Sequence, residues 1–271
     1  MGGVYDGLTA RLADQAGFEV LFMGGFSVAA TMLGEPDFGY LTQTEMADCA
    51  RRVCRLTQRP VLVDADTGYG NPLNVLRTVE LYHAAGAAGM FLEDQVWPKR
   101  CGHMQGKQVV ERREWLSKLR AVVSERGRHD LFLVARTDAR AAVGLDEAIA
   151  RGQAARDLGV DAVFVEAPES VEEFERIARA IPGPKVANMV EGGRTPLLPP
   201  EDLHALGFDL IVTPLAALLS AAKAVRETYA ELRRAGTMRG QLDRLLSFDE
   251  FNGLIDLERH YALERRFRDE S

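Results

Sequence analysis

The sequence lacks the features that mark several common classes of protein. It has three cysteines in 271 residues, Cys49, Cys54 and Cys101, too few for a disulfide framework, which favours reduced thiols in a cytoplasmic protein. It contains no apolar run long enough to cross a bilayer and no signal-peptide pattern. Neither a Gly-x-Gly-x-x-Gly fingerprint nor a Walker sequence follows an apolar run, which disfavours dinucleotide and P-loop binding.

The chain also lacks an excess of positive charge. Its formal net charge is −7 and its sequence pI is near 5.4. A mild acidic excess disfavours nucleic acid as a partner. We therefore expect a small-molecule partner, with no nucleic acid and no membrane. An anionic ligand would need a metal ion or a local cluster of Arg and Lys to overcome the overall field.

Short apolar runs alternate with segments of helical periodicity along the whole chain. Seven runs are visible, and a shorter one lies near Val4; the seven are residues 20–23, 61–64, 90–93, 131–135, 162–166, 185–189 and 210–213. Runs that are apolar on both faces are typical of parallel strands covered by helices. A single alternating series without a linker predicts one (β/α)8 barrel over residues 1–271.

Helix boundaries are marked by capping residues. Capping boxes begin at Thr42, Ser170 and Ser247, and Asn71 precedes a proline at the first helical position. Helices are expected over residues 73–85, 111–126, 145–158, 216–234 and from 247 to about 267.

Three acidic residues at predicted strand ends form a candidate metal site, since the active site of a barrel lies at the carboxyl ends of its strands. Asp64 and Asp66 are two apart on a segment expected to be extended, so both should face one side, and Glu93 ends the next strand. Converging carboxylates repel one another, and Mg²⁺, or alternatively Mn²⁺, would relieve that repulsion. The competing interpretation is that these acids cap helices or pair with Arg136 and Lys99.

The segment 97–110 is too long for a minimal loop and has no helical periodicity. It contains Lys-Arg-Cys-Gly-His at 99–103 and a further glycine, Gly106, which suits a mobile lid. Basic neighbours and the imidazole of His103 would favour the thiolate of Cys101 and make it a usable acid or base. A zinc site at Cys101 and His103 lacks a second ligand pair, and a solvated basic loop is the other alternative.

Arg136 follows the run 131–135. Its planar guanidinium can bind both oxygens of a substrate carboxylate. The alternative is a structural salt bridge to Glu166 or Asp138.

Five motifs, in this order along nearly the whole chain, resemble the isocitrate lyase / phosphoenolpyruvate mutase superfamily. They are DADTGYGN at 64–71, EDQ at 93–95, PKRCGH at 98–103, ARTD at 135–138 and NMVEGGRTP at 188–196. The resemblance implies a (β/α)8 barrel. It also implies that the C-terminal helical segment, 241–271, is exchanged between subunits of a homotetramer made of two helix-swapped dimers.

The resemblance also implies roles for individual residues. Asp64 and Asp66 would match the Mg²⁺-binding acids, with Glu93 holding metal waters. Asp37 would match a further acid near the site, and we consider it a candidate base; Cys101 would match the lid cysteine of the lyases. The residues expected to contact the substrate are Phe22, Gly24, Gly25, Lys99, Gly102, His103, Arg136, Glu166, Asn188 and Thr213.

The resemblance implies Mg²⁺-dependent cleavage of a carbon–carbon bond in a small 2-hydroxy or 2-oxo dicarboxylic acid, through an enolate. The alternatives are a carboxyphosphonoenolpyruvate phosphonomutase, an oxaloacetate hydrolase or decarboxylase, and a barrel that binds an acid without catalysis.

Several residues depart from the family's pattern. Gly24 stands where the family often has a hydroxyl, and Phe22 where it often has tyrosine. The family's methylisocitrate lyases carry an arginine in the stretch that matches residues 213–219, and this chain has none there, which argues against a tricarboxylate substrate. Phe26 and Leu219 instead predict a smaller or more apolar distal pocket.

Overall fold

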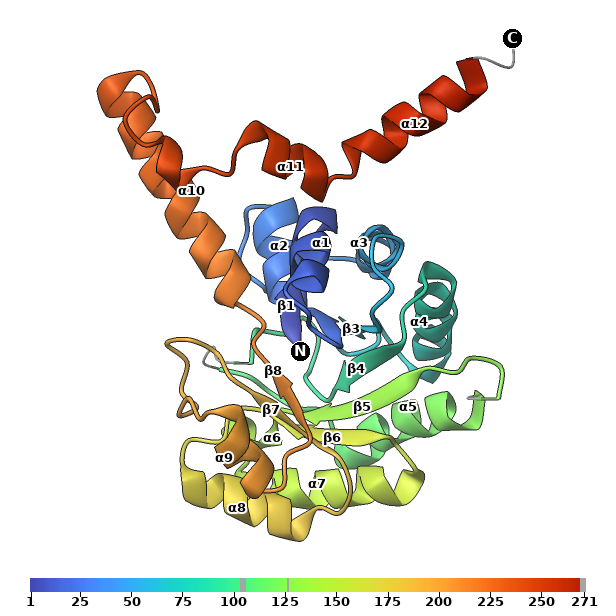
Figure 1. Ribbon diagram of the computed structural model, residues 1–271. Helices are drawn as coiled ribbons and strands as arrows, with labels where there is room; N and C mark the ends of the chain where they lie inside the picture. Colours follow the sequence, from blue (N-terminus) through green and yellow to red (C-terminus); the bar gives the residue numbers. More distant parts are fainter. Residues whose placement is uncertain (103–105, 126, 269–271) are drawn as a thin grey trace. The chain divides into compact units, whose positions relative to one another are not determined.

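The computed structural model describes residues 1–102, 106–125 and 127–268 (Figure 1). The chain forms two compact units, Met1–Ala216 and Ala217–Ser271. His103, expected to contact the substrate, lies outside the described residues.

The first unit is built on eight parallel strands that pair in chain order, β1 to β8. They are β1 (Gly2–Val4), β2 (Leu21–Met23), β3 (Val61–Asp64), β4 (Gly89–Glu93), β5 (Phe132–Thr137), β6 (Ala162–Val165), β7 (Lys185–Asn188) and β8 (Leu210–Val212). The circle closes after β8, because Gly2 bridges to Thr213 and the Gly3 amide donates to the Thr213 carbonyl at 3.1 Å. The predicted (β/α)8 barrel is confirmed.

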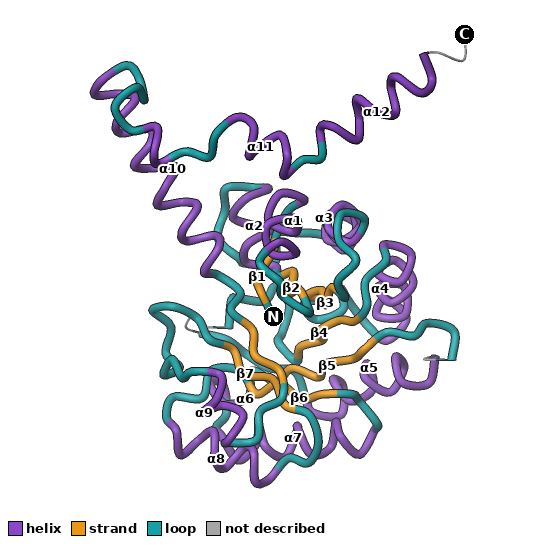
Figure 2. Tube along the Cα trace, viewed as in Figure 1, coloured by secondary structure: helices purple, strands orange, loops and turns teal. Residues whose placement is uncertain are grey.

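Helices surround the barrel, as Figures 1 and 2 show. They are α1 (Gly7–Gln15), α2 (Gly25–Met32), α3 (Gln43–Cys54), α4 (Pro72–Ala85), α5 (Arg112–Glu125), α6 (Ala139–Ala142), α7 (Leu145–Leu158), α8 (Val171–Ala180) and α9 (Pro200–Ala205). The expected caps are present: Thr42 accepts from the Glu45 amide, and Asn71 accepts from the Leu73 amide ahead of α4. These local signals fix where α3 and α4 begin, and so where the loops before them end.

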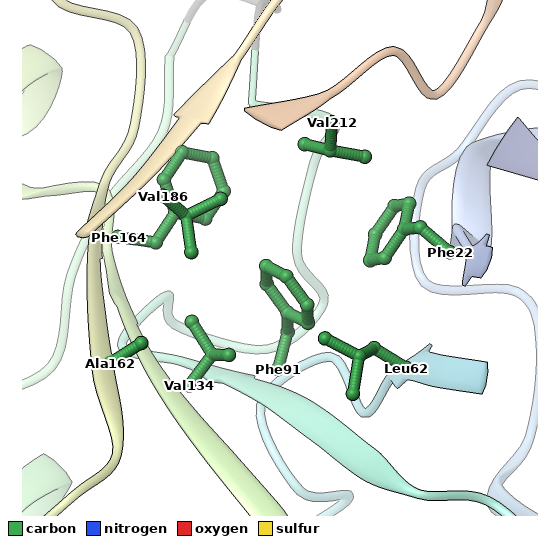
Figure 3. Packing of buried hydrophobic residues seen from close by; sticks show 8 residues of the cluster. All are labelled: Phe22, Leu62, Phe91, Val134, Ala162, Phe164, Val186 and Val212. Carbon is green, nitrogen blue, oxygen red and sulfur yellow. The ribbon is translucent and has the colours of Figure 1, made fainter. Parts of the chain in front are cut away.

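Apolar side chains from seven strands fill the barrel interior (Figure 3). The Phe91 ring meets Phe22 edge-on at a centroid distance of 4.8 Å and Phe164 at 6.0 Å. The cluster comprises Phe22, Leu62, Phe91, Val134, Ala162, Phe164, Val186 and Val212. Because such interiors are close-packed, this cluster holds the strand ends in fixed positions.

The second unit is helical: α10 (Ala216–Ala235, beginning at the last residue of the first unit), a 3-10 turn at Leu242–Arg244, α11 (Phe248–Leu254) and α12 (Leu257–Arg268). The prediction of one helix from 247 to about 267 is wrong. Asp256, with φ of 63°, separates α11 from α12, and Asp tolerates this left-handed conformation better than most residues. Among the described residues, no helix is long and apolar enough to cross a membrane.

Candidate active site

A pocket lies where the barrel strands end and their following loops begin. Its cavity volume is about 50 Å³, below the usual range for small-molecule sites. Its lining comprises Phe22, Gly24, Gly25, Phe26, Ser27, Asp37, Asp64, Cys101, Gly102, Arg136, Phe164, Glu166, Asn188, Val190, Val212, Pro214 and Leu215. Ten of the sequence-predicted site residues are therefore brought together: Phe22, Gly24, Gly25, Asp37, Asp64, Cys101, Gly102, Arg136, Glu166 and Asn188.

Asp64, the last residue of β3, brings a carboxylate to this pocket. It accepts hydrogen bonds from the Gly25 amide at 3.1 Å and the Asp66 amide at 3.0 Å. A Cβ on Gly25 would lie 3.3 Å from an oxygen of each aspartate, so glycine keeps this approach open. The expectation of an extended segment fails at Asp66, whose φ of 46° places it in a turn. Its side chain still lies beside Asp64 because the turn folds its amide back onto that carboxylate.

Lys99 is the cation nearest these aspartates. Its Nζ lies 2.6 Å from Asp66 Oδ1 and 2.7 Å from Asp37 Oδ2, and its side chain is 2% exposed. Burial alone would lower the pKa of Lys99, but Asp66, Asp64 and Asp37 outweigh it and hold that pKa well above its usual value. Burial raises the pKa of Asp66 to about 6; Lys99 opposes this shift, and Asp64 and Asp37 reinforce it.

Glu93, at the end of β4, is buried beside Arg136, whose Nη1 lies 3.2 Å from Glu93 Oε2. Burial raises the pKa of Glu93 well above its usual value, although Arg136 opposes the shift. Within the described residues, Glu93 Oε1 has neither a hydrogen bond nor an ion pair, whereas Glu93 Oε2 and Asp66 Oδ1 are held only by their ion pairs to Arg136 and Lys99. A buried oxygen such as Glu93 Oε1 is expensive unless something outside the chain satisfies it.

The balance of buried charge also favours a cation bound at this site. Among the described residues, six buried carboxylates gather here around three buried cationic side chains: Asp37, Asp64, Asp66, Glu93, Asp138 and Glu166 around Lys99, Lys107 and Arg136. A further buried acid beside them, Asp94, is paired with the buried Arg151. In the part of the chain that the structure describes, no three acidic, histidine or cysteine side chains are placed to hold an ion directly. The chemistry of Asp64, Asp66 and Glu93 nevertheless fits Mg²⁺, because all three are buried and offer carboxylate oxygens, and Mg²⁺ takes few such ligands while keeping several waters.

Arg136 is held in place by carboxylates on several sides. Its Nε and Nη2 donate to Asp138 at 2.9 and 3.2 Å, and Nη2 lies 3.4 Å from Glu166 Oε2. Burial would lower the pKa of Arg136, but Asp138, Glu93 and Glu166 raise it well above its usual value. The salt bridges expected as the alternative to a substrate clamp are therefore present, and the residue also lines the pocket.

Asn188, the last residue of β7, lies beside Glu166. Its Nδ2 is 3.4 Å from both Glu166 carboxylate oxygens, while its buried Oδ1 has no hydrogen-bond partner in the described residues. An amide oriented by Glu166 on one side and unsatisfied on the other can bind a polar ligand group.

The segment after β4 brings Cys101 and Gly102 to the pocket. Gln95 fixes its start, donating to the Arg100 carbonyl at 2.8 Å and accepting from the Arg100 amide at 3.0 Å. The Cys101 amide donates to the Asp37 carbonyl at 3.3 Å. A Cβ on Gly102 would lie 2.4 Å from Glu166 Oε2, so only glycine allows this approach.

Some predicted residues do not line the pocket. Asp66, Glu93 and Lys99 are absent from its lining. Thr213 is used in the closure of the barrel, through its bonds to Met1 and Gly3.

Sequence reasoning did not assign Ser27, Phe164, Val190, Pro214 or Leu215 to the site. Their positions just after, or within, strands two, six, seven and eight were the available signal. From the sequence alone, an apolar residue that lines the pocket cannot be told from one that packs in the barrel core.

The fold and site define a class of protein: a (β/α)8-barrel enzyme with an acidic cluster and a cysteine at a small, partly apolar pocket. The phosphoenolpyruvate phosphomutase family matches residues 1–233. The chain belongs to this family, and thereby to the isocitrate lyase / phosphoenolpyruvate mutase superfamily.

Named relatives carry several activities. The chain is 47% identical to the chloroplastic carboxyvinyl-carboxyphosphonate phosphorylmutase of Arabidopsis thaliana, covering 98% of this chain and 80% of the relative. It is 44% identical to 2,3-dimethylmalate lyase of Eubacterium barkeri, covering 98% and 92%.

Solved structures agree with the family. Oxaloacetate acetylhydrolase in complex with 3,3-difluorooxalacetate matches with a TM-score of 0.92 at 39% identity, covering 97% of this chain and 90% of that one. Phosphonopyruvate hydrolase in complex with oxalate and Mg²⁺ matches with a TM-score of 0.87 at 31% identity, covering 98% and 93%.

Lys99→Met should destabilise the metal-free protein by about 3–5 kcal/mol near neutral pH, because it leaves buried carboxylates without their counter-ion. The folded-state pKa of Asp66 is about 6, above its ordinary value of 3.8, so the folded protein takes up this proton more readily than the unfolded chain. The loss of stability should therefore be largest above that pKa and shrink as the pH falls through it. Urea unfolding at several pH values measures this.

Arg59→Met is the matched control. Arg59 pairs with Asp14 at 2.8 Å, but the two side chains are 43% and 34% exposed. Its removal should cost less than about 1 kcal/mol. Equal losses in the two variants, or a loss at Lys99 that does not change with pH, would contradict this account of the acidic cluster.

Proposed function

We propose that this chain is a Mg²⁺-dependent lyase that breaks a carbon–carbon bond in a small 2-hydroxy dicarboxylic acid. The observation that carries the proposal is that one pocket is lined by Asp64 of the acidic cluster, by Arg136 and by Cys101. These supply an anchoring point for a cation, a positive charge for a carboxylate and a proton donor within one small space. A 2-oxo dicarboxylic acid would use the same groups.

Asp64 and Asp66 would hold the Mg²⁺, with Glu93 binding its waters through Oε1, which has no hydrogen bond in the described chain. When bound, Mg²⁺ would act as a Lewis acid toward the oxygens of the substrate. The second carboxylate of the substrate would meet Arg136, with Asn188 donating or accepting beside it. Mn²⁺ would suit the same oxygen ligands.

The reaction needs one base and one acid from the chain. Asp37 lines the pocket and can take the proton of the substrate's 2-hydroxyl group. The electrons of that O–H bond then form the carbonyl, and the electrons of the adjacent carbon–carbon bond pass to the departing carbon as an enolate. The thiol of Cys101 protonates that carbon. Asp37 then releases its proton to water and the Cys101 thiolate takes one up from water, so that both groups return to their starting states. Lys99, bonded to Asp37, orients the base.

The apolar part of the lining supports a small aliphatic distal group on the substrate. Phe22, Phe26, Val190 and Leu215 contribute hydrocarbon to the pocket, and no arginine other than Arg136 lines it among the described residues. A third carboxylate would therefore be buried without a partner, which is costly. The 44% identity to a 2,3-dimethylmalate lyase favours the same substrate class.

Phosphonomutase chemistry is the second candidate, favoured by the 47% identity to a carboxyvinyl-carboxyphosphonate phosphorylmutase. Oxaloacetate hydrolysis is favoured by the likeness to oxaloacetate acetylhydrolase. A turnover screen with Mg²⁺ separates these reactions. We expect 2-hydroxy dicarboxylic acids with methyl substituents to be cleaved to a 2-oxo acid and a monocarboxylic acid, and 2-methylisocitrate to be cleaved poorly. A new carbon–phosphorus signal in phosphorus NMR from a carboxyphosphonoenolpyruvate-type substrate would reject the lyase.

Cys101→Ser should keep Mg²⁺ and ligand binding and lose most turnover, because the hydroxyl is a far weaker acid than the thiol. General acid catalysis of this kind is worth about 10²–10⁴-fold in rate. Steady-state kinetics with the cleaved substrate, together with calorimetric titration of oxalate in the presence of Mg²⁺, measures both. Cys54→Ser, in α3, is the control and should keep full turnover. Undiminished cleavage by Cys101→Ser would remove the acid role.

We also propose that the chain assembles as a homotetramer in which the segment 241–271 is exchanged between subunits. Helices α10 and α12 have no buried residue, and Val225, Tyr229 and Leu232 form an exposed apolar stripe along α10. A stripe with this spacing is normally covered.

Light scattering of the chain in solution should therefore give the mass of four copies. Tyr229→Lys should shift that mass toward smaller species. Lys223→Glu, which changes a charge on the opposite face of the same helix, should leave it unchanged. A monomeric native chain would contradict the assembly.

A further inference from the structure

Lys107 is a buried cation that the proposed reaction does not use. Its side chain is 1% exposed, and its Nζ lies 2.7 Å from Asp138 Oδ1. The same Nζ donates a hydrogen bond to the Gly102 carbonyl. Burying an ammonium group is expensive, so a lysine that is almost fully enclosed between these two acceptors is not a chance surface contact.

Each acceptor of Lys107 is next to a residue of the pocket. Gly102 follows Cys101 directly, and both line the pocket. Asp138 is fully buried after β5 and accepts two bonds from Arg136. Lys107 therefore joins the segment that carries Cys101 to the carboxylate that orients Arg136.

Asp138 is a firm anchor for such a connection. Its amide donates to Asp94 Oδ1 at 2.8 Å, and Asp94 in turn pairs with Arg151 of α7 at 3.0 Å. Burial would raise the pKa of Asp138, but Arg136 and Lys107 outweigh it and lower that pKa to about 2. Asp138 is therefore a charged, immobile acceptor at the end of β5.

The backbone at Gly102 packs closely against the Glu166 carboxylate. A Cβ on Gly102 would lie 2.4 Å from Glu166 Oε2, and Glu166 Oε2 lies 3.4 Å from Arg136 Nη2. The backbone beside Cys101 is thus packed against the same carboxylate cluster that surrounds Arg136.

We propose that Lys107 is a positioning residue: its bonds to the Gly102 carbonyl and to Asp138 set the place of Cys101 relative to Arg136. It is not itself part of the pocket lining and touches none of the proposed reacting atoms. The expected effect of Lys107 on turnover assumes the proposed function, whereas its expected effect on the position of Cys101 does not.

The first test measures the position of Cys101 without any turnover. Lys107→Met keeps the length of the side chain and removes the donor and the charge. We expect iodoacetamide to alkylate Cys101 several-fold faster in this variant than in the native chain, followed peptide by peptide with mass spectrometry. Cys49 and Cys54 serve as internal references, because burial raises the pKa of each thiol to about 11 and should keep both slow to react.

Lys185→Met is the matched control variant. Lys185 is also buried and its Nζ donates to backbone carbonyls, those of Ile181 and Gly183, but it begins β7 at the opposite end of the barrel. This variant should lose stability and leave the alkylation of Cys101 unchanged. A folded Lys107→Met variant with native alkylation of Cys101 would overturn the inference.

The second test separates positioning from a purely structural role. In Lys107→Met we expect kcat on the cleaved acid to fall about 10- to 100-fold, the cost of a small misplacement of a reacting group. KM should change less, because Arg136 keeps its bonds to Asp138, Glu93 and Glu166. Lys107→Arg, which can still donate to both acceptors, should restore most of kcat.

Asp138→Asn tests the connection from its other end. In that background, Lys107→Met should accelerate the alkylation of Cys101 much less than it does in the native chain, since the two changes break one interaction. If Lys107→Met does not fold, Lys107→Gln, with a donor but no charge, replaces it; native alkylation in that variant also overturns the inference. Faster alkylation in a chain without lyase turnover would uphold the positioning role and reject the proposed reaction.

Discussion

The site depends on an excess of buried negative charge at the carboxyl ends of the barrel strands. Six carboxylates lie there around three cationic side chains, each cation bonded to at least one of them. In an unstructured loop, the repulsion between these carboxylates would drive them apart. It persists because the packed aromatic and aliphatic residues of the barrel interior, seen in Figure 3, hold the strand ends in place.

Each of the three cationic side chains makes a different set of contacts. Lys99 neutralises the aspartates of the acidic cluster, Arg136 faces the pocket, and Lys107 joins the segment of Cys101 to Asp138. The acids left without a hydrogen-bond partner, Glu93 above all, are where we propose that a hydrated divalent ion belongs. In this family the acidic cluster would locate the substrate, while the residues around Cys101 and the apolar lining would select the reaction and the distal group.

The relatives illustrate that division. A phosphorylmutase, a carbon–carbon lyase and a hydrolase share this fold at 39–47% identity. Because fold does not fix chemistry, the choice among their reactions must come from a few side chains in the pocket. We propose that the positions of Phe22, Gly24 and Leu215 contribute to that choice, since they line the pocket without belonging to the charged cluster.

The sequence by itself determined the order of the elements, the barrel and most of the residues at its mouth. Hydrophobic periodicity and capping residues are local properties of the sequence. They therefore sufficed to place strand ends such as Asp64 and Glu93. Only the tertiary structure decided what those residues contact. The use of Thr213 in barrel closure and the bond from Lys107 to Asp138 depend on groups distant in the sequence. The turn at Asp66 and the break at Asp256 are local backbone conformations that hydrophobic periodicity did not reveal. Buried charge pairs follow from packing in three dimensions, which no periodicity along the chain encodes.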